Sequence, residues 1–217
     1  MAAIENLKKA LATMGLSVPE EALSDLVWLL EELLRWNKKI NLTAITEPAE
    51  ALEKHLLDSL TPLPWLSGVE RLLDMGSGAG FPGLPLKLAR PDLKVVSLDS
   101  HQKKIGFQQH VVRCLKLNDF TAKAWRLEDA AGIATMAGQF DVAVARALTA
   151  LDRLMDMSRP FLAKNGLLLA MKGSEGEAEL QQAASKIEKE GWRVERLIKL
   201  RLPHSGAART LIWLRGS

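Results

Sequence analysis

Three glycines at alternate positions, Gly76, Gly78 and Gly80, follow an apolar run and precede Pro82. Glycine adopts positive φ without a Cβ clash and lets a ligand approach the backbone closely. Proline suits the first turn of a helix, where its missing N–H costs nothing. The segment 71–89 therefore predicts a buried strand, a tight ligand-binding turn and a helix, which together open a nucleotide-type α/β unit.

Two classes of ligand fit such a turn. Residues 78–83 satisfy the G-x-G-x-x-G pattern of dinucleotide sites, although that pattern alone is weak. Asp74 lies two residues before the first glycine, where a carboxylate would oppose a pyrophosphate held by the turn and the helix N-terminus. S-adenosylmethionine (SAM) carries an ammonium and a sulfonium, so an acid beside the turn favours SAM. The alternative is that Asp74 only caps a turn.

A second acid, Asp99, ends the next expected strand, 94–99. A carboxylate at this position in the unit meets the hydroxyls of a ribose in dinucleotide sites, and SAM also contains a ribose. Asp and Ser are also common helix N-caps, so Asp99 or its neighbour Ser100 fits that simpler role as well.

The first 70 residues show helical patterns. A Ser-x-x-Glu capping box at 17–20, with a proline inside it, predicts the start of a helix that fades near Asn37. Another helix is expected to open at 46–48 and to end at Pro62 and Pro64. We therefore expect an N-terminal helical extension.

From residue 71 onward, strand and helix patterns alternate, which implies a parallel sheet with right-handed crossovers. The expected strands are 71–75, 94–99, 120–124, 140–145 and 166–172, and the expected helices are 84–89, 103–117, 150–161 and 175–190. Two final strands, 193–201 and 208–215, leave no room between them for a helix and so require an antiparallel hairpin.

Five parallel strands closed by an antiparallel hairpin are the layout of class I SAM-dependent methyltransferases. A dinucleotide-binding domain, by contrast, normally keeps its sixth strand parallel. The predicted fold class is therefore α/β, with a Rossmann-like methyltransferase sheet over residues 71–217 and a helical extension over residues 1–70.

Composition excludes several other classes. The single cysteine of the 217 residues rules out an intrachain disulfide and a thiolate metal cluster, and the four histidines lack metal-ligand spacing, so no metal is expected. No apolar run reaches the ~20 residues needed to span a bilayer. The N-terminal segment lacks the apolar core of a signal peptide. We expect a cytoplasmic monomer without a membrane partner.

The net charge of +3 is unevenly distributed, because residues 1–70 carry 6 basic and 11 acidic side chains whereas residues 192–217 carry 6 and 1. This polarity is compatible with a basic face for a polyanion such as nucleic acid. Scattered surface lysines would give the same totals.

The carboxyl ends of parallel strands form the ligand-binding edge of such sheets. Residues 126–129 follow the third strand, where a side chain and a backbone N–H are placed to hold an adenine, unless they form an ordinary surface turn. Arg146 ends the fourth strand, at the mouth through which a methyl acceptor would enter. An arginine there pairs with a carboxylate or phosphate of a ligand, or it makes a structural ion pair.

The acceptor chemistry is narrowed by what the sequence lacks. No Asn/Asp-Pro-Pro-aromatic run follows the fourth strand, and Cys114 lies inside an expected helix, which argues against methylation of an exocyclic amine or a pyrimidine carbon. Guanine N7 has an in-plane lone pair and needs no general base. Transfer to it would rest on alignment of N7, methyl and sulfur, with Arg146 as a positioning residue.

Several segments together resemble the family of bacterial 16S rRNA guanine-N7 methyltransferases known as RsmG or glucose-inhibited division protein B. The resemblance extends over almost all of the chain. The segments that carry it are Asn41-Leu42-Thr43, His55-Leu56-Leu57-Asp58-Ser59, residues 74–83, 98–100 and 126–128, Arg146-Ala147, and residues 171–173.

This resemblance implies SAM-dependent methyl transfer to N7 of one guanine in the 530 loop of 16S rRNA. SAM would be the cofactor, S-adenosylhomocysteine the product, and small-subunit rRNA or the small subunit the partner. By similarity, Gly76, Phe81, Leu127, Glu128 and Arg146 would contact the cofactor or border its site, and Asp99 would take the ribose. Family members commonly have Ser where this chain has Ala145. Together with the glycine-turn residues, the predicted cofactor-binding set is Asp74, Gly76, Gly78, Gly80, Phe81, Asp99, Leu127, Glu128 and Arg146.

For the RNA-binding face we predict basic and polar side chains that would neutralise or contact phosphates, with binding that weakens as salt rises. They are Arg35, Lys38, Lys39, Asn41, Lys103, Lys172, Arg201 and Arg209. Lys38 and Lys39 also suit a helix C-terminus, and Lys103 suits an exposed helix face.

Two other function classes stay open from the residues alone. One is a dinucleotide-dependent oxidoreductase that uses residues 78–83, although no clear hydride-transfer acid is present. The other is a non-catalytic RNA-binding or ribosome-assembly protein on the same fold.

Overall fold

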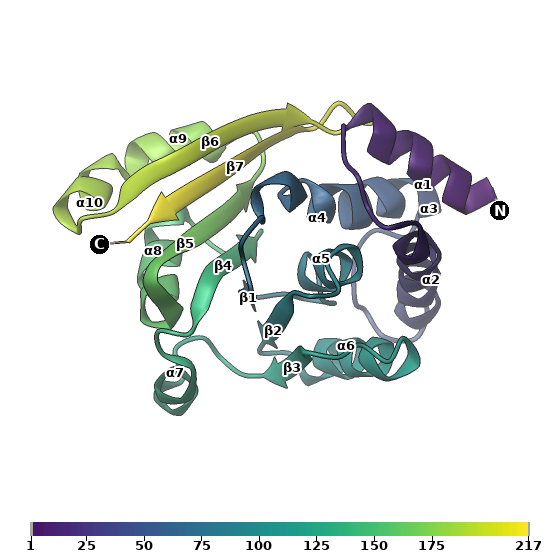
Figure 1. Ribbon diagram of the computed structural model, residues 1–217, viewed down its shortest axis with the longest axis horizontal. Coiled ribbons are helices and arrows are strands. Elements are labelled where there is room, and N and C mark those ends of the chain that lie inside the picture. The colour runs from purple at the N-terminus through teal and green to yellow at the C-terminus, as the bar shows by residue number, and fades with distance from the viewer. Residues whose placement is uncertain (1, 217) are drawn as a thin grey trace.

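The computed structural model describes residues 2–216, whose centre is one seven-stranded sheet in the order β3-β2-β1-β4-β5-β7-β6 (Figure 1). The strands are β1 (Arg71–Met75), β2 (Lys94–Asp99), β3 (Phe120–Ala124), β4 (Phe140–Arg146), β5 (Leu162–Lys172), β6 (Arg193–Arg201) and β7 (Ala208–Arg215). The first five are parallel, and β7 runs antiparallel to both β5 and β6. The expected parallel sheet with a C-terminal hairpin is confirmed.

Alternate residues of the central strands face two apolar layers, because successive side chains of a strand point to opposite faces. Leu72, Val142 and Val144 face one layer, and Leu73, Ala143 and Ala145 face the other. The first layer is covered by α5 (Gly83–Ala89), α6 (Gln102–Cys114) and the N-terminal helices. The second is covered by α7 (Ala130–Met136), α8 (Leu151–Ser158), α9 (Gly176–Gln182) and α10 (Ala184–Lys189).

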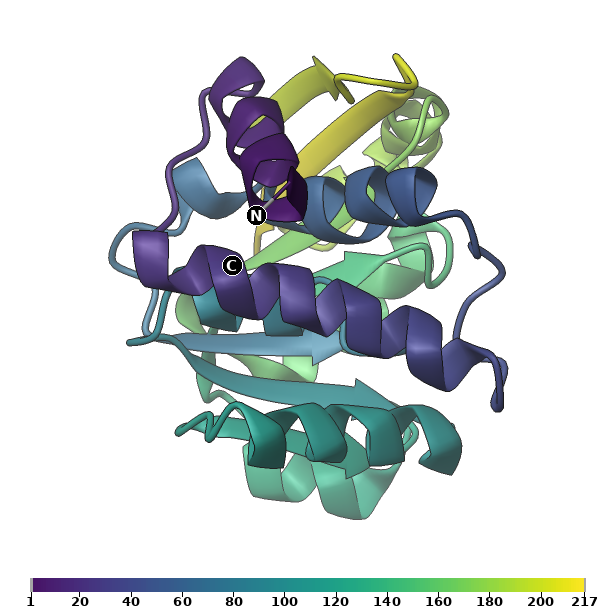
Figure 2. The same cartoon turned by 90° about the vertical axis from the view of Figure 1, so that its right-hand side faces the viewer.

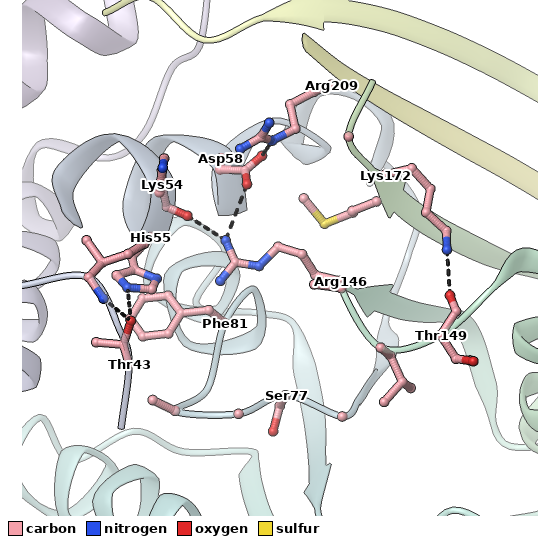
Figure 3. Close-up of a pocket in the computed structure, with 18 of the residues that line it drawn as sticks. Thr43, Lys54, His55, Asp58, Ser77, Phe81, Arg146, Thr149, Lys172 and Arg209 are labelled. Atoms are coloured by element: carbon pink, nitrogen blue, oxygen red, sulfur yellow. Dashed lines mark hydrogen bonds and ion pairs between the residues drawn. The ribbon is translucent and has the colours of Figure 1, made fainter. Parts of the chain in front are cut away.

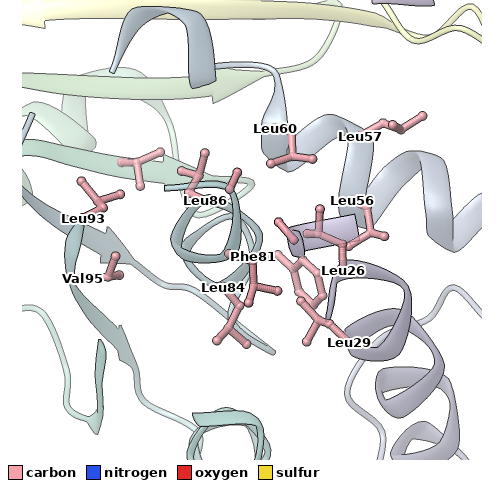
Figure 4. Packing of buried hydrophobic residues seen from close by; sticks show 14 of the residues in the cluster. Leu26, Leu29, Leu56, Leu57, Leu60, Phe81, Leu84, Leu86, Leu93 and Val95 are labelled. Carbon is pink, nitrogen blue, oxygen red and sulfur yellow. The ribbon is translucent and has the colours of Figure 1, made fainter. Parts of the chain in front are cut away.

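The N-terminal helices share the first apolar layer with the sheet. They are α1 (Ala2–Thr13), α2 (Glu20–Asn37), α3 (Pro48–Ala51), a π-helical turn (Leu52–Leu57) and α4 (Asp58–Leu60). In Figure 2 α1 and α2 lie in front of the strands. Leu29 of α2 and Leu56 of the π-helical turn gather with Phe81 and Leu84 from the β1–α5 region (Figure 4). Each fully buried leucine stabilises this arrangement by roughly 2 kcal/mol.

The expected capping box at 17–20 is wrong. Helix α2 begins at Glu20, with Pro19 at its N-cap and no side-chain hydrogen bond from Ser17. The physical reason is that a residue preceding proline is disfavoured in the helical region, so the helix starts only after Pro19.

Other differences concern short or mixed segments. Helix α7 was not expected, because its Ala- and Gly-rich sequence has little periodicity; it is capped by Asp129, whose carboxylate accepts from the Ala131 N–H. The helix expected at 150–161 ends as a 3₁₀ turn (Arg159–Phe161), and β5 starts at Leu162, earlier than residue 166. Among residues 2–216, no helix has both the length and the apolar character that crossing a membrane requires.

Candidate functional site

The three glycines after β1 all adopt positive φ, at 66°, 59° and 94° for Gly76, Gly78 and Gly80. A Cβ on Gly76 would lie 2.4 Å from Leu148 Cδ1, and one on Gly80 would lie 2.5 Å from Leu84 Cδ1. A Cβ on Gly78 would meet nothing within 4 Å. Gly76 and Gly80 therefore allow close packing of protein, whereas Gly78 presents its backbone to open space.

Asp74, which the sequence places beside the ligand, lies beneath this turn in the structure. Its side chain is fully buried, and its Oδ2 accepts the N–H of Gly83 at 2.8 Å. Burial raises the pKa of Asp74 to about 7, although the Gly83 N–H and the charge of Arg146 oppose that rise. Asp74 therefore holds the start of α5 and lines neither of the cavities described next. Gly80 also lies outside both linings.

Two cavities open at the carboxyl edge of the sheet, and Gly76, Gly78, Ala147 and Leu148 line both of them. We call the larger one, of about 610 Å³, the arginine cavity, since Arg146 and Arg209 line it. The smaller one, of about 500 Å³, contains Asp99 and is the aspartate cavity. Both fall in the size range of sites for small organic ligands.

Asp99 holds the glycine turn and the start of α6 at the same time. Its Oδ2 accepts the Gly78 N–H at 2.8 Å, and its Oδ1 accepts the His101 N–H at 2.8 Å. The same Oδ1 also lies 2.9 Å from His101 Nδ1. A carboxylate has about four acceptor positions, so Asp99 keeps capacity for one hydroxyl donor. Leu127 and Glu128 line the same cavity, as does Trp125. With Gly76 and Gly78, the structure thus brings five of the nine predicted cofactor residues together.

Arg146 lies in the other cavity, and its partners come from the N-terminal helices (Figure 3). Its Nη1 donates to the Lys54 carbonyl at 2.6 Å and lies 3.4 Å from Asp58 Oδ2. The Lys54 carbonyl belongs to the π-helical turn, and such turns occur often at functional sites. Burial lowers the pKa of Arg146, but arginine remains protonated at neutral pH. Its Nε and Nη2 make no hydrogen bond within residues 2–216 and remain available to a ligand.

Asp58 stands between two arginines. Its Oδ1 accepts from Arg209 Nε at 2.9 Å, while its Oδ2 faces Arg146. The side chain of Asp58 is only 7% exposed, so both ion pairs are shielded from water. This arrangement joins α4, the end of β4 and the start of β7 in one network.

Thr43 and His55, both within the family-like segments, form the opposite side of the arginine cavity. Thr43 Oγ1 lies 3.0 Å from His55 Nε2, and the rings of His55 and Phe81 are 5.0 Å apart. The Nδ1 atom of His55 is buried without a partner among residues 2–216. Burial and the nearby charge of Arg146 lower the pKa of His55 to about 4, so the ring is neutral at physiological pH.

The pKa of His55 predicts a specific pH dependence of stability. Below pH 6.5 the unfolded chain protonates this histidine while the folded chain does not until about pH 4, so the free energy of unfolding falls as pH drops through that window. Between pH 7.5 and pH 4.5, the free energy of unfolding of the wild type should fall by about 2–3 kcal/mol more than that of His55→Gln. Urea denaturation of both proteins at the two pH values measures this difference; a constant difference would contradict it.

Lys172 is not a free cation. Its side chain is 8% exposed, and its Nζ pairs with Glu179 Oε2 at 2.7 Å and donates to the Thr149 carbonyl at 2.5 Å. This arrangement places Lys172 in the wall of the arginine cavity and commits two of its three donors to the protein. The expectation of a phosphate contact at Lys172 is therefore not supported by its surroundings.

The remaining residues predicted for the RNA face are dispersed. Lys38, Lys39 and Asn41 are exposed after α2, and Lys103 is exposed in the first turn of α6. Arg35 pairs with the buried Glu32, and Arg201 is exposed at the end of β6. Of the eight predicted residues, only Lys172 and Arg209 line the arginine cavity.

The sequence reasoning missed several residues of the site, which are Thr43, Lys54, His55, Asp58, Gln108, Leu148 and Glu179. The sequence did contain one indication that His55 and Asp58 belong to the same site. They are three residues apart in an expected helix, so they share a helix face. No group of three or more His, Cys, Asp or Glu side chains within residues 2–216 has the geometry to hold a metal ion.

Comparisons with a family model and with related sequences both give the same family. The family model described as rRNA small subunit methyltransferase G matches residues 22–208. The chain is 53% identical to ribosomal RNA small subunit methyltransferase G of Syntrophotalea carbinolica, over 96% of each chain, and 40% identical to that of Geobacter sulfurreducens, over 95% of this chain and 94% of that one.

Solved structures support the same fold at low sequence identity. A SAM dependent methyltransferase from Aquifex aeolicus matches with a TM-score of 0.57 and 16% identity, over 74% of this chain and 92% of that one. A ribosomal protein L11 methylase from Lactobacillus delbrueckii subsp. bulgaricus matches with a TM-score of 0.56 and 17% identity, over 76% and 79%.

Proposed function

Because the chain belongs to the rRNA small subunit methyltransferase G family, we propose that it transfers the methyl group of SAM to N7 of a guanine in the 530 loop of 16S rRNA. The observation that carries the proposal is the pair of adjoining cavities, one with the features of a nucleoside site and the other lined by excess positive charge. Lys54, Arg146, Lys172 and Arg209 outnumber Asp58 and Glu179 around the arginine cavity. A net positive lining suits a phosphate-bearing substrate.

The residues present fit SAM. Asp99 keeps acceptor capacity for a ribose hydroxyl, and Leu127 with Trp125 offers an apolar slot for adenine. The open space above Gly78 allows the methionine portion to pass between the two cavities. Bound SAM supplies an electrophilic methyl group on its sulfonium.

The chain's own residues then align the acceptor. Neutral His55 and protonated Arg146 offer no strong base, which is consistent with attack by the N7 lone pair without deprotonation. In that step the bond from N7 to the methyl carbon forms as the bond from carbon to sulfur breaks. Arg146 positions the acceptor through its Nε and Nη2 donors, and Phe81 and His55 provide an aromatic surface beside it.

The glycine turn depends on a side chain from α6. Gln108 is fully buried, and its Nε2 donates to Ser77 Oγ at 2.9 Å and to the Gly78 carbonyl at 2.8 Å. Loss of these two bonds in Gln108→Ala should weaken SAM binding about tenfold. Titration calorimetry tests this, with the exposed Gln109→Ala as the matched control. Equal affinities of the two variants would contradict the assignment.

Sodium borohydride and aniline cleave RNA at N7-methylguanosine and so test the proposed function directly. Small-subunit rRNA from cells with and without the gene would be compared for a cut in the 530 loop. A cut that disappears without the gene supports the proposal. An unchanged pattern, together with no transfer from labelled SAM to unmodified rRNA or subunits, would refute it.

The two alternative function classes give different results in these assays. A dinucleotide-dependent oxidoreductase would bind NADH and not SAM. A non-catalytic assembly protein would keep its cellular role in Asp99→Ala, whereas the enzyme should lose its role. We also propose that the protein acts as a monomer, and that residues 1–70 form an N-terminal helical extension of the SAM-binding domain 71–217.

A further inference from the structure

The loop between β4 and α8, residues 147–150, separates the two cavities. Ala147 and Leu148 line both of them, and Ala147 holds a positive φ of 52°. The Leu148 side chain packs so closely over Gly76 that any Cβ there would clash with it. The position of this loop therefore determines the shape of the passage between the two cavities.

One ion pair fixes the loop from the side. Lys172 Nζ, at the end of β5, donates to the Thr149 carbonyl at 2.5 Å and pairs with Glu179 Oε2 at 2.7 Å. The same Glu179 oxygen accepts the N–H of Leu151 at 3.0 Å. Lys172 and Glu179 thus hold both ends of the segment 149–151, which directly follows Leu148.

The ion pair is itself held in place by packing. A Cβ on Gly176, at the start of α9, would lie 2.6 Å from Thr210 Cβ and 2.9 Å from Lys172 Cβ. Helix α9 therefore approaches β5 and β7 as closely as a glycine allows, which brings Glu179 to Lys172. The low exposure of Lys172, 8%, leaves little of it to contact RNA.

We propose that Lys172 and Glu179 are a positioning pair for methyl transfer, which holds the 147–151 segment so that Leu148 lies correctly between cofactor and acceptor. This inference rests on the proposed function. It assigns Lys172 to the enzyme's internal geometry rather than to phosphate binding. It also gives a role to Glu179, whose charge a phosphate-binding site would not need.

If the proposal holds, neither Lys172 nor Glu179 alone is sufficient to hold the 147–151 segment in position. Removing Glu179 leaves a buried ammonium without its counter-charge, and removing Lys172 leaves the Thr149 carbonyl without its donor. A displacement of the loop by about 1 Å is enough to reduce catalysis about 100-fold, because the reacting atoms must stay in line.

The test compares Lys172→Met, Glu179→Ala and the double variant in steady-state methyl transfer, together with RNA binding at several salt concentrations. We expect kcat to fall about 10- to 100-fold in each single variant, and no further in the double variant. The KM for RNA should change less than about threefold, and the salt dependence of RNA binding should be unaltered. Lys172→Arg and Glu179→Gln should each restore part of kcat.

The opposite result would overturn the proposal. If Lys172 contacts a phosphate, Lys172→Met should reduce the slope of log affinity against log salt by about 0.7–0.9, and Glu179→Ala should leave RNA binding equal or tighter. The Lys199–Glu177 pair is a matched control, because it also joins a strand to α9, at 2.6 Å, but is exposed. Lys199→Met and Glu177→Ala should leave kcat unchanged.

A readout independent of activity separates the two proposals. Hydrogen exchange of the Leu151 amide should accelerate at least tenfold in Glu179→Ala and remain at the wild-type rate in Glu177→Ala. Unchanged exchange would overturn the positioning role even in an active enzyme. Failure of the proposed function would instead appear as an inactive wild type with normal exchange at Leu151.

Discussion

Arg146→Ala should reduce kcat for methyl transfer about 100-fold or more, which is the loss that follows removal of one positioned donor from an active site. The structure gives the reason, because Arg146 is anchored through Nη1 to the Lys54 carbonyl and Asp58 while Nε and Nη2 remain free toward the cavity. Alanine removes both the anchor and the donors. Single-turnover transfer from labelled SAM to rRNA measures the effect.

Two controls separate catalysis from folding in this experiment. Arg146→Lys keeps the charge but not the planar fork, so it should recover only a small part of the rate. Circular dichroism and thermal unfolding must show a folded Arg146→Ala protein, since its side chain is only 17% exposed and touches the N-terminal helices. Full activity in a folded Arg146→Ala protein would reduce Arg146 to a structural residue.

Asp58→Ala should have the largest effect on stability. The substitution leaves Arg146 and Arg209, which are 17% and 18% exposed, facing each other without the carboxylate that both of them contact. Breaking a buried ion pair by removing one partner costs about 3 kcal/mol or more, which corresponds to a fall of roughly 6–12 °C in Tm for a chain of this size. Urea and thermal denaturation measure both quantities.

The matched control for Asp58 is Glu195, which pairs with Arg215 at 3.1 Å between β6 and β7, where the two side chains are 44% and 33% exposed. Glu195→Ala should lower the free energy of unfolding by less than about 1 kcal/mol, because exposed pairs contribute little. If Asp58→Ala cost no more than Glu195→Ala, the Arg146–Asp58–Arg209 network would not stabilise the fold.

The strands were predictable because their signals are local. β1, β2, β3, β6 and β7 begin and end at the expected residues, since each is an apolar or alternating run bounded by turn residues. The C-terminal hairpin was predictable because the connection between the last two strands is too short for a helix. This hairpin distinguished a methyltransferase sheet from a dinucleotide-binding domain better than the glycine pattern did. Arg146 was placed at the cavity by the same reasoning, as the last residue of β4.

The partners of those residues were not predictable, because they are distant in sequence. Asp58 lies 88 residues from Arg146 and 151 residues from Arg209, and no periodicity indicates which helix face will meet which strand end. The orientation of Asp74, which lines neither cavity, was unpredictable for a related reason. Its place before the glycines was correctly read, but which side of the turn its carboxyl faces depends on α5 packing against it.

The ion pair of Asp58 with Arg209 joins residues that are synthesised far apart in time. Asp58 is synthesised early and Arg209 near the end. The nascent chain therefore contains the glycine turn and Asp99 long before the arginine cavity can be completed. Leu211 and Trp213, which complete the apolar layer over the N-terminal helices, arrive later still. A growing chain therefore contains the residues of the proposed nucleoside site before it contains all the residues of the proposed polyanion site.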